Sequence, residues 1–417
     1  MDLRTGVRSV TVPFGRSRPG VAGLRGGTSD SVRAVTISEL HSDEALRRRE
    51  FPVVQDSVYL AHAGVCPLPR RVSDAVNGYS AACAMADQEA AIPAGTVHRI
   101  RQSAARLIGA QADEISLVGP TSLALSQVAA GLHVKRGQNV LVYHDCYPSN
   151  VYPWMALADR GVEVRFMNIR ELGRIRVVDV QGQIDEDTRL VSIASAHYLT
   201  GFRVNIDAIG KMLRSRGVLF CLDAIQTLGA FPTPATHVDI LAADSHKWLL
   251  GPCAAGILYV RKEVQPHIRP VVHGWHNVKC PDFLTQDDMQ FQEGGRRYEA
   301  GTHNFLGLLG LEAALKLVQE IGVEAIASEL SRKRAWLAPA IQAKGYEVLR
   351  ADVLPDNAGG ITSFHRPGDD MSALHRKLGE AGVVTSRRRM PDGQWLIRLS
   401  PHFYNTDAEL QRFLDVI

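Results

Sequence analysis

The chain has 417 residues, which is long enough for two domains and a large buried core. Its 47 basic and 44 acidic residues leave a net charge of +3, so nothing points to nucleic acid or an anionic membrane as a partner. The closest two of the six cysteines, Cys66 and Cys83, are 17 positions apart. This spacing excludes a CxxC metal or redox motif, and we expect free thiols and a cytoplasmic protein without a metal site.

Residues 1–45 are expected to form a disordered or poorly packed N-terminal tail. Residues 1–29 contain five arginines, one acidic residue and many Gly, Ser and Pro. Such an arginine-rich, acid-poor start can be an organelle transit peptide, although a disordered extension or an upstream start codon is the simpler interpretation. The stretch 115–134 lacks charged side chains, but Gly119, Pro120 and several polar residues interrupt it, so we expect no membrane span.

From Tyr59 onward, apolar runs that suit buried strands alternate with segments of helical spacing. The strand-like runs are 139–144, 162–169, 189–194, 218–222, 239–243 and 256–260. Segments of helical spacing lie between them at 149–159 and 205–216. Near-continuous Val, Ile and Leu strands with intervening helices predict an α/β fold, in which a mainly parallel sheet is covered by helices on both faces.

Two domains are expected after the tail. Residues 46–310 form the large domain that contains the parallel sheet, and a long helix near 304–321 follows it. Residues 311–417 form a smaller C-terminal α/β domain, with strands expected at 346–349 and 395–399.

The segment Gly119-Pro120-Thr121-Ser122 opens a helix that is expected to run to Leu132. The free N–H groups and the positive dipole end of a helix N-terminus attract anions, and the hydroxyl groups of Thr121 and Ser122 can add donors. An ordinary Ser/Thr helix cap is the alternative interpretation. The segment therefore predicts an anion site only if other residues supply a ligand.

Two such residues follow neighbouring strands of the predicted sheet. Asp223 comes directly after the run 218–222, and Lys247 follows the run 239–243. Because the carboxyl ends of parallel strands meet at one edge of a sheet, both side chains open into one crevice. Pyridoxal 5'-phosphate (PLP) needs a lysine amine that forms a Schiff base with its aldehyde, and an aspartate that keeps its pyridine nitrogen protonated. We therefore predict PLP as the cofactor, with its phosphate on Thr121 and Ser122.

Four further residues are candidates for the same site. Tyr147, which follows the strand run 139–144, can stack on the pyridine ring, and Gln226 can donate to the ring's phenolate oxygen. His246, next to the lysine, can bind phosphate. Arg398 lies within an apolar strand, where its planar guanidinium suits the carboxylate of an amino-acid substrate.

Together these residues resemble the class V aminotransferase family of fold-type I PLP enzymes, which includes cysteine desulfurases, selenocysteine lyases, kynureninase and isopenicillin N epimerase-like proteins. The matching stretches are YLAHAGVCPLPRRV (59–72), GPTS (119–122), YPSNVYPW (147–154), YLTGFRVNI (198–206), LDAIQTLGA (222–230), DSHKWLLGP (244–252), RRYEAGTHN (296–304) and IRLSPHFYNT (397–406). They occur in the order that the family has and cover about residues 55–410.

The resemblance implies the PLP-transferase fold type I and a homodimer with shared active sites. It also implies that Lys247 forms the Schiff base and shuttles a proton, and that Ser245 joins Thr121, Ser122 and His246 on the phosphate. Thr302 would reach the phosphate of the neighbouring subunit. The implied roles of Asp223, Gln226, Tyr147 and Arg398 are those given above.

Two departures from the desulfurase pattern bear on the reaction. The loop expected at 383–389 has no cysteine, whereas desulfurases carry a catalytic cysteine there, and nothing in their spacing brings Cys66 or Cys280 in its place. Tyr198, a candidate for substrate binding, stands where desulfurases usually have asparagine and looks more like the epimerase-annotated branch. Because no two glycines are spaced G-x-G, a nicotinamide-dependent oxidoreductase is excluded.

The expected function is quinonoid chemistry at Cα or Cβ of an amino acid, carried out by a lyase (C–S-lyase-like) or an epimerase-like enzyme. An aminotransferase of the same family and a conventional cysteine desulfurase with an unrecognised cysteine remain open. A PLP-binding protein without catalysis is a further alternative. Loss of a proton from Cα, with Lys247 as the base, is common to the catalytic alternatives.

Overall fold

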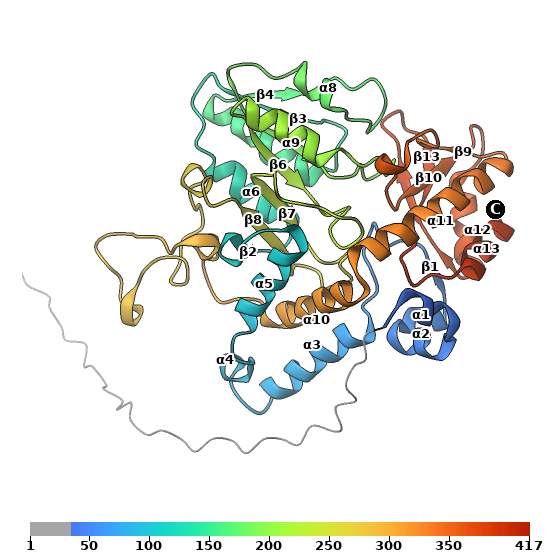
Figure 1. Ribbon diagram of the computed structural model, residues 1–417, viewed down its shortest axis with the longest axis horizontal. Helices are drawn as coiled ribbons and strands as arrows, with labels where there is room; N and C mark the ends of the chain where they lie inside the picture. The colour runs from blue at the N-terminus through green and yellow to red at the C-terminus, as the bar shows by residue number, and fades with distance from the viewer. Residues whose placement is uncertain (1–34) are drawn as a thin grey trace, which may run out of the picture. The chain divides into compact units, whose positions relative to one another are not determined.

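A seven-stranded β-sheet forms the centre of the computed structural model, which describes residues 35–417 (Figure 1). The strand order is β2-β8-β7-β6-β5-β3-β4. Strands β3 to β7 run parallel to one another, whereas β8 runs antiparallel to both β7 and β2. The strands are β2 (Ile115–Leu117), β3 (Asn139–Val142), β4 (Glu163–Phe166), β5 (Thr188–Ala194), β6 (Leu219–Asp223), β7 (Ile240–Ala243) and β8 (Ile257–Val260).

This sheet confirms the α/β class and all six expected strand runs, and it adds the three-residue β2. Side chains alternate across each strand, so successive residues enter hydrophobic cores on opposite faces. Val140 and Cys221 belong to one core, and their neighbours Leu141 and Phe220 belong to the other. The first core contains α6 (Thr121–Gly131) and α7 (Tyr152–Met155); the second contains α5 (Thr96–Ile108), α8 (Val177–Gln181), α9 (Ile206–Ser215) and α10 (Phe305–Ile321).

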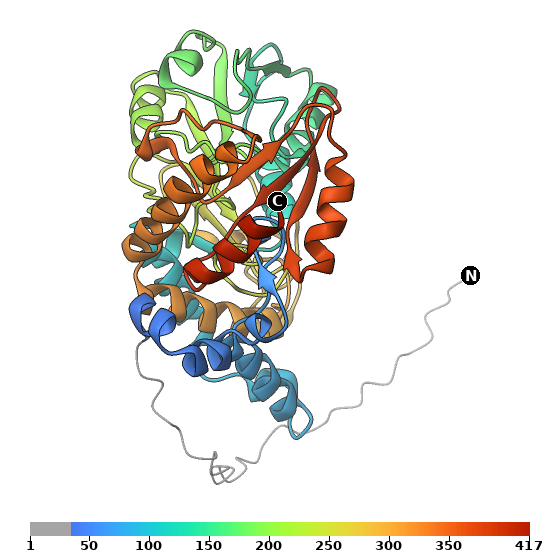
Figure 2. The same ribbon diagram turned by 90° about the vertical axis from the view of Figure 1, so that its right-hand side faces the viewer.

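A smaller antiparallel sheet of order β12-β13-β10-β9 lies in the C-terminal part of the chain (Figure 2). Its strands are β9 (Glu347–Val348), β10 (Thr362–His365), β12 (Ser386–Arg389) and β13 (Trp395–Leu399). It shares a third hydrophobic core with α11 (Val323–Ala343), α12 (Met371–Glu380) and α13 (Asp407–Val416). The smaller α/β part that the sequence predicts is therefore present, with β9 and β13 as its two expected strands.

The boundary expected at residue 310 falls inside α10. That helix packs against α3 (Arg70–Cys83) and α5, which belong to the larger part, whereas α11 packs against β9, β10 and α13. The short helix α4 (Gln88–Ala91) contacts the end of α3. Gly322 separates α10 from α11, and we propose it as the boundary between the two parts.

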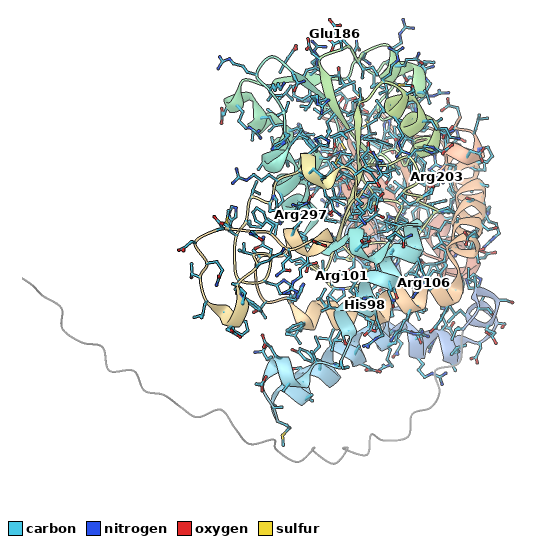
Figure 3. All side chains as sticks on the ribbon, turned by 60° about the vertical axis from the view of Figure 1, so that its left-hand side comes forward. His98, Arg101, Arg106, Glu186, Arg203 and Arg297 are labelled. Carbon is cyan, nitrogen blue, oxygen red and sulfur yellow. The ribbon has the colours of Figure 1, made fainter. Side chains whose placement is uncertain are left out.

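The N-terminal segment joins the two parts, because β1 (Val58–Tyr59) pairs in parallel with β11 (Val383–Val384) (Figure 2). A second connection comes from Arg203, which is labelled in Figure 3. Its Nε donates a hydrogen bond of 2.8 Å to the carbonyl of Ala358, and its guanidinium lies over the Phe231 ring. The larger and smaller parts are thus in direct contact.

The chain is already helical within the stretch expected as tail. Helices α1 (Ile37–Ser42) and α2 (Glu44–Glu50) begin inside residues 35–45, whereas residues 1–34 lie outside the described part of the chain. Thr36 and Glu39 form a capping box at α1, and His41 Nε2 lies 2.8 Å from the carbonyl oxygen of Phe403. The capping box was a local sign of a helix, whereas the contact with Phe403, which is distant in sequence, appears only in the structure.

Within residues 35–417, every helix is too short or too polar to cross a lipid bilayer.

Candidate active site

A cavity of about 500 Å³ lies beyond the carboxyl ends of β6 and β7, between the larger and smaller parts. Strand ends, the N-terminus of α6 and the strands β12 and β13 contribute its walls. The lining residues are Tyr59, Ala61, Ala63, Gly64, Val65, Pro120, Thr121, Ser122, Tyr147, Ser149, Asp223, Ile225, Gln226, His246, Lys247, Val384, Thr385, Ser386, Arg388 and Arg398. Ligands of α/β proteins bind at this end of a parallel sheet.

Lys247 and Asp223 face this cavity from adjacent strand ends, and both are almost fully buried. Burial lowers the pKa of the Lys247 amine to about 8; the Asp223 carboxylate opposes this shift, and the guanidinium groups of Arg398 and Arg388 add to it. Burial also raises the pKa of Asp223, although the N–H of Ile225 and the charge of Lys247 lower it in part. The amine is thus available near neutral pH as a nucleophile or a base.

Asp244 positions the loop that carries Lys247, a role that the sequence did not suggest. Its carboxylate accepts hydrogen bonds from the backbone N–H groups of Ser245, Ala254 and Ala255, at 2.8, 3.0 and 3.0 Å. It also lies 2.8 Å from Nδ1 of His246. Although burial opposes ionisation, the imidazole and these N–H donors hold the pKa of Asp244 below its ordinary value. Its place three residues before the lysine was the available sign of this role.

The N-terminus of α6 forms part of one wall of the cavity, where it could hold an anion. Its N-cap residue, Pro120, makes no side-chain hydrogen bond to the helix, so N–H groups of the first turn remain available. Ser122 Oγ lies 2.7 Å from Ser149 Oγ, and both residues line the cavity. Thr121 Oγ1 accepts a hydrogen bond of 2.9 Å from the N–H of Asp244, which ties the helix to the lysine loop. These donors, with His246 beside them, fit the phosphate of PLP.

Ser245 does not share this wall. Its side chain is fully buried, and its hydroxyl donates a hydrogen bond of 2.7 Å to the carbonyl of Pro252. A Cβ atom added at Gly251 would lie 2.5 Å from this hydroxyl oxygen, so the side chain points into the loop. The structure thus turns Ser245 away from the cavity that its neighbours His246 and Lys247 line.

Tyr147 and Gln226 line the cavity together with Lys247, so both side chains are available to a ligand there. The Lys247 amine is 5.4 Å from the centre of the Tyr147 ring, which is half-exposed to the cavity. The Gln226 amide donates to the carbonyl of Ala63 at 3.2 Å and accepts from the Trp248 indole at 2.9 Å. An amide nitrogen carries two hydrogens, so one donor of Gln226 remains for a ligand.

Arg398 is the clearest unsatisfied group of the site. Its side chain is 2% exposed, and Nη1 donates to the backbone oxygen of Tyr198 at 2.8 Å, whereas Nε and Nη2 are buried without a hydrogen-bond partner among residues 35–417. Burial and the nearby Arg388 lower the pKa of the guanidinium to about 9. Burying a guanidinium with two unpaired donors costs folding free energy, unless a ligand carboxylate accepts hydrogen bonds from both.

Tyr198 acts on this site from outside the cavity lining. Besides its carbonyl contact with Arg398, its ring meets Tyr147 edge to face, with centroids 5.5 Å apart. It therefore supports two residues that line the cavity.

The segment expected as a loop at 383–389 forms the strands β11 and β12 instead. Strand alternation separates its three arginines. Arg387 and Arg389 lie over the Trp395 ring, at 4.2 and 5.8 Å from its centre, whereas Arg388 lines the cavity. Because the three residues are identical, the sequence does not show which of them faces the cavity. The pairing of β12 with β13 shows that it is Arg388.

All six cysteines belong to the described residues, and none lines the cavity. Cys66 is buried, its thiol lies 3.7 Å from the carbonyl oxygen of Gly251, and burial raises its pKa to about 12. Cys280 donates to the carbonyl of Trp275 in a separate loop. The chain therefore places no cysteine thiolate in its own cavity.

Thr302 also lies apart from the cavity of its own chain. It is exposed beside a cluster of His276, Glu299 and His303, whose ligand atoms lie within 4.8 Å of one another. The Glu299 carboxylate already accepts from Nη2 of Arg101 at 2.5 Å, a residue of α5 labelled in Figure 3. Because Arg101 supplies the positive charge, we assign no metal to this cluster.

Comparison with known proteins gives a match to the family "Aminotransferase class-V" over residues 58–413. The chain is 28% identical to a "probable cysteine desulfurase" of Methanothermobacter thermautotrophicus, over 87% of this chain and 94% of that protein. It is 29% identical to the "uncharacterized aminotransferase YcbU" of Bacillus subtilis, over 89% and 96%.

Solved structures show the same fold. The cysteine desulfurase of Thermococcus onnurineus NA1 has a TM-score of 0.80 at 23% identity, covering 88% of this chain and 96% of that one. The cystine C–S lyase C-DES, in complex with its product cysteine persulfide, has a TM-score of 0.79 at 22% identity, covering 88% and 98%. In another structure of C-DES, glycine is covalently linked to PLP. The architecture is thus that of the fold-type I PLP enzymes.

Proposed function

The chain belongs to the aminotransferase class-V family of PLP-dependent enzymes, and we propose that it acts with PLP at Cα or Cβ of an amino acid. One observation supports this proposal above all. A buried amine and a buried carboxylate, Lys247 and Asp223, face one cavity together with the unpaired guanidinium of Arg398. Such a set of charges is unfavourable in an empty protein and is compensated by a cofactor and an anionic substrate.

PLP supplies an electron sink for the charge that develops at the substrate's Cα. Lys247 would hold it covalently, and Thr121, Ser122 and His246 would hold its phosphate. Asp223 would keep a proton on the ring nitrogen, because a buried carboxylate is stabilised by a cationic neighbour. Tyr147 would cover the ring, and Gln226 would donate its free N–H to the ring oxygen.

Arg398 would orient the substrate through its α-carboxylate, with Tyr198 fixing the guanidinium. Lys247, released when the substrate amine replaces it, would remove the proton from Cα. A pKa of about 8 for this amine suits the task, since a base is most effective when its pKa lies near the working pH. Lys247, Asp223 and Arg398 are each buried, which strengthens the electrostatic contacts that they would make with a ligand.

Among the reactions that begin in this way, we propose cleavage of a bond at Cβ, as in a lyase. Relatives named for cleavage of C–S bonds support this choice. Transfer of sulfur to an enzyme thiol is not proposed, because no cysteine lines the cavity. Epimerisation and transamination begin with the same proton removal and are the alternatives that product analysis separates.

The test is reduction of the PLP-loaded protein with borohydride, followed by peptide mass mapping. We expect a yellow protein and a fixed adduct on Lys247, which the Lys247→Ala variant loses. Lys333 is an internal control: burial also lowers its pKa to about 8, but its Nζ is paired with Glu329 and with the carbonyls of His402 and Phe403. A protein that stays colourless with added PLP would contradict the proposal.

Product analysis with a panel of amino acids then separates the reactions. A keto acid with release of the Cβ substituent indicates a lyase, racemised amino acid indicates an epimerase, and a keto acid with an aminated cofactor indicates an aminotransferase. Absence of every product, with PLP bound, would leave a binding protein and overturn the catalytic assignment.

A further inference from the structure

Two arginines line the same wall of the cavity from neighbouring strands. In the antiparallel pairing of β12 with β13, Ser386 lies opposite Arg398, and Arg388 lies opposite Leu396. Residues opposite each other, or two apart on one strand, share a face of the sheet. Arg388 and Arg398 are therefore diagonal neighbours on the cavity face, with a separation on the order of 7–8 Å.

The positive charges of this wall exceed what one substrate carboxylate can balance. The segment from β11 to β13 contributes Arg388 and Arg398 to the lining of the cavity and contributes no acidic residue. In the described part of the chain, neither arginine has a carboxylate within ion-pair distance. An α-carboxylate on Arg398 would still leave the charge of Arg388 unmatched.

The surroundings of Arg388 differ from those of its two neighbours. Arg387 and Arg389 are used in the structure: both cover Trp395, Arg387 donates to the hydroxyl of Ser372, and Arg389 donates to the carbonyl of Gly393. Arg388 makes one hydrogen bond, 3.2 Å long, to the carbonyl of Arg387. Arg388 therefore lines the cavity without the ring contact that its two neighbours make.

The space around the guanidinium of Arg388 is open and polar. Its Nη2 faces Gly64, where an added Cβ atom would lie 3.7 Å away. Thr385, another lining residue of the same segment, has a buried hydroxyl without a hydrogen-bond partner. Glycine at position 64 leaves the space beside the guanidinium unfilled by a side chain.

We infer that the substrate is an amino acid with a second acidic group on its side chain, a carboxylate or a sulfur oxyacid, which Arg388 binds while Arg398 binds the α-carboxylate. This inference rests on the proposed function and specifies its substrate class. A planar guanidinium can hold either acid through two parallel hydrogen bonds. Arg388 is thus a specificity-determining residue, distinct from the groups that hold the cofactor.

The test compares two probes that bind but cannot lose a Cα proton: 2-methylaspartate, with a second carboxylate, and 2-aminoisobutyrate, without one. Their dissociation constants are measured with the PLP-loaded protein by calorimetry and by the change in visible absorbance. We expect the wild type to bind 2-methylaspartate about ten- to hundredfold more tightly, which corresponds to about one charge-assisted hydrogen bond. Arg388→Gln should lose this preference and retain its affinity for 2-aminoisobutyrate.

Arg387→Gln is the matched control, because it removes an arginine next to Arg388 that faces away from the cavity. It should keep the wild-type preference. Equal affinity of the wild type for both probes, or an equal loss of both in Arg388→Gln, would overturn the inference and leave the proposed function intact. Failure of the wild type to bind PLP would overturn the proposed function itself.

Discussion

Replacing Arg398 by lysine keeps a positive charge at the substrate end of the cavity and removes the planar fork. In the wild type, Nη1 is occupied by the carbonyl of Tyr198, while Nε and Nη2 are free. Two free donors in one plane can meet both oxygens of a carboxylate. A lysine amine has a single nitrogen, and it cannot satisfy the carbonyl of Tyr198 and reproduce the two parallel bonds.

The structure sets the size of the expected effect. Arg398→Lys loses at least one hydrogen bond to a charged group, about 1.5–3 kcal/mol, which is about 10- to 150-fold in the dissociation constant. Arg398→Met removes the charge and leaves the substrate carboxylate unpaired, about 2–5 kcal/mol, or roughly thirtyfold to several thousandfold. Stability should not fall with affinity. Because the guanidinium is buried without an acidic partner, the free energy of unfolding of Arg398→Met should be at least as large as that of the wild type.

The assay is titration of the PLP-loaded variants with the amino acid that the product screen identifies, together with urea unfolding of the same samples. Arg387→Lys serves as the control, because that side chain lies over Trp395 outside the cavity. Substrate affinity of Arg398→Lys within threefold of wild type would refute the reasoning. So would a large loss of stability in Arg398→Met, because it would make the arginine a structural residue.

Two further predictions concern the cofactor end of the site. Asp223→Asn should retain bound PLP, since Lys247 and the N-terminus of α6 remain to hold it. Its turnover should fall about a hundredfold or more, because the proton on the ring nitrogen loses its carboxylate partner. Turnover near that of the wild type would mean that another residue keeps this proton in place. The pKa of Lys247 is lowered to about 8, and only the neutral amine attacks an aldehyde. Cofactor-free protein should therefore capture PLP about tenfold faster per pH unit up to about 8 and level off above it; a rate that still rises between pH 9 and 10 would contradict the lowered pKa.

The sequence by itself predicted the features that follow from local patterns. Apolar runs identified the six main strands, and an acid and a lysine after two of them located Asp223 and Lys247 at one edge of the sheet. The Gly-Pro-Thr-Ser segment likewise predicted that Thr121 and Ser122 begin a helix, as they do in α6. These expectations depend only on strand period, helix capping and the parallel order of the sheet, all of which leave traces in neighbouring residues.

Tertiary structure alone decided which side chains reach the cavity, because side-chain direction depends on contacts between distant segments. Ser245 lies between Asp244 and His246, yet its hydroxyl donates to the carbonyl of Pro252 and points away from the cavity. Arg388 is one of three consecutive arginines, and its pairing opposite Leu396 gives it the cavity face. The two unpaired donors of Arg398 are also visible only in three dimensions, since any residue within 35–417 could have been their partner. A periodic sequence pattern shows that faces alternate, and only the register with a partner strand determines which face meets the substrate.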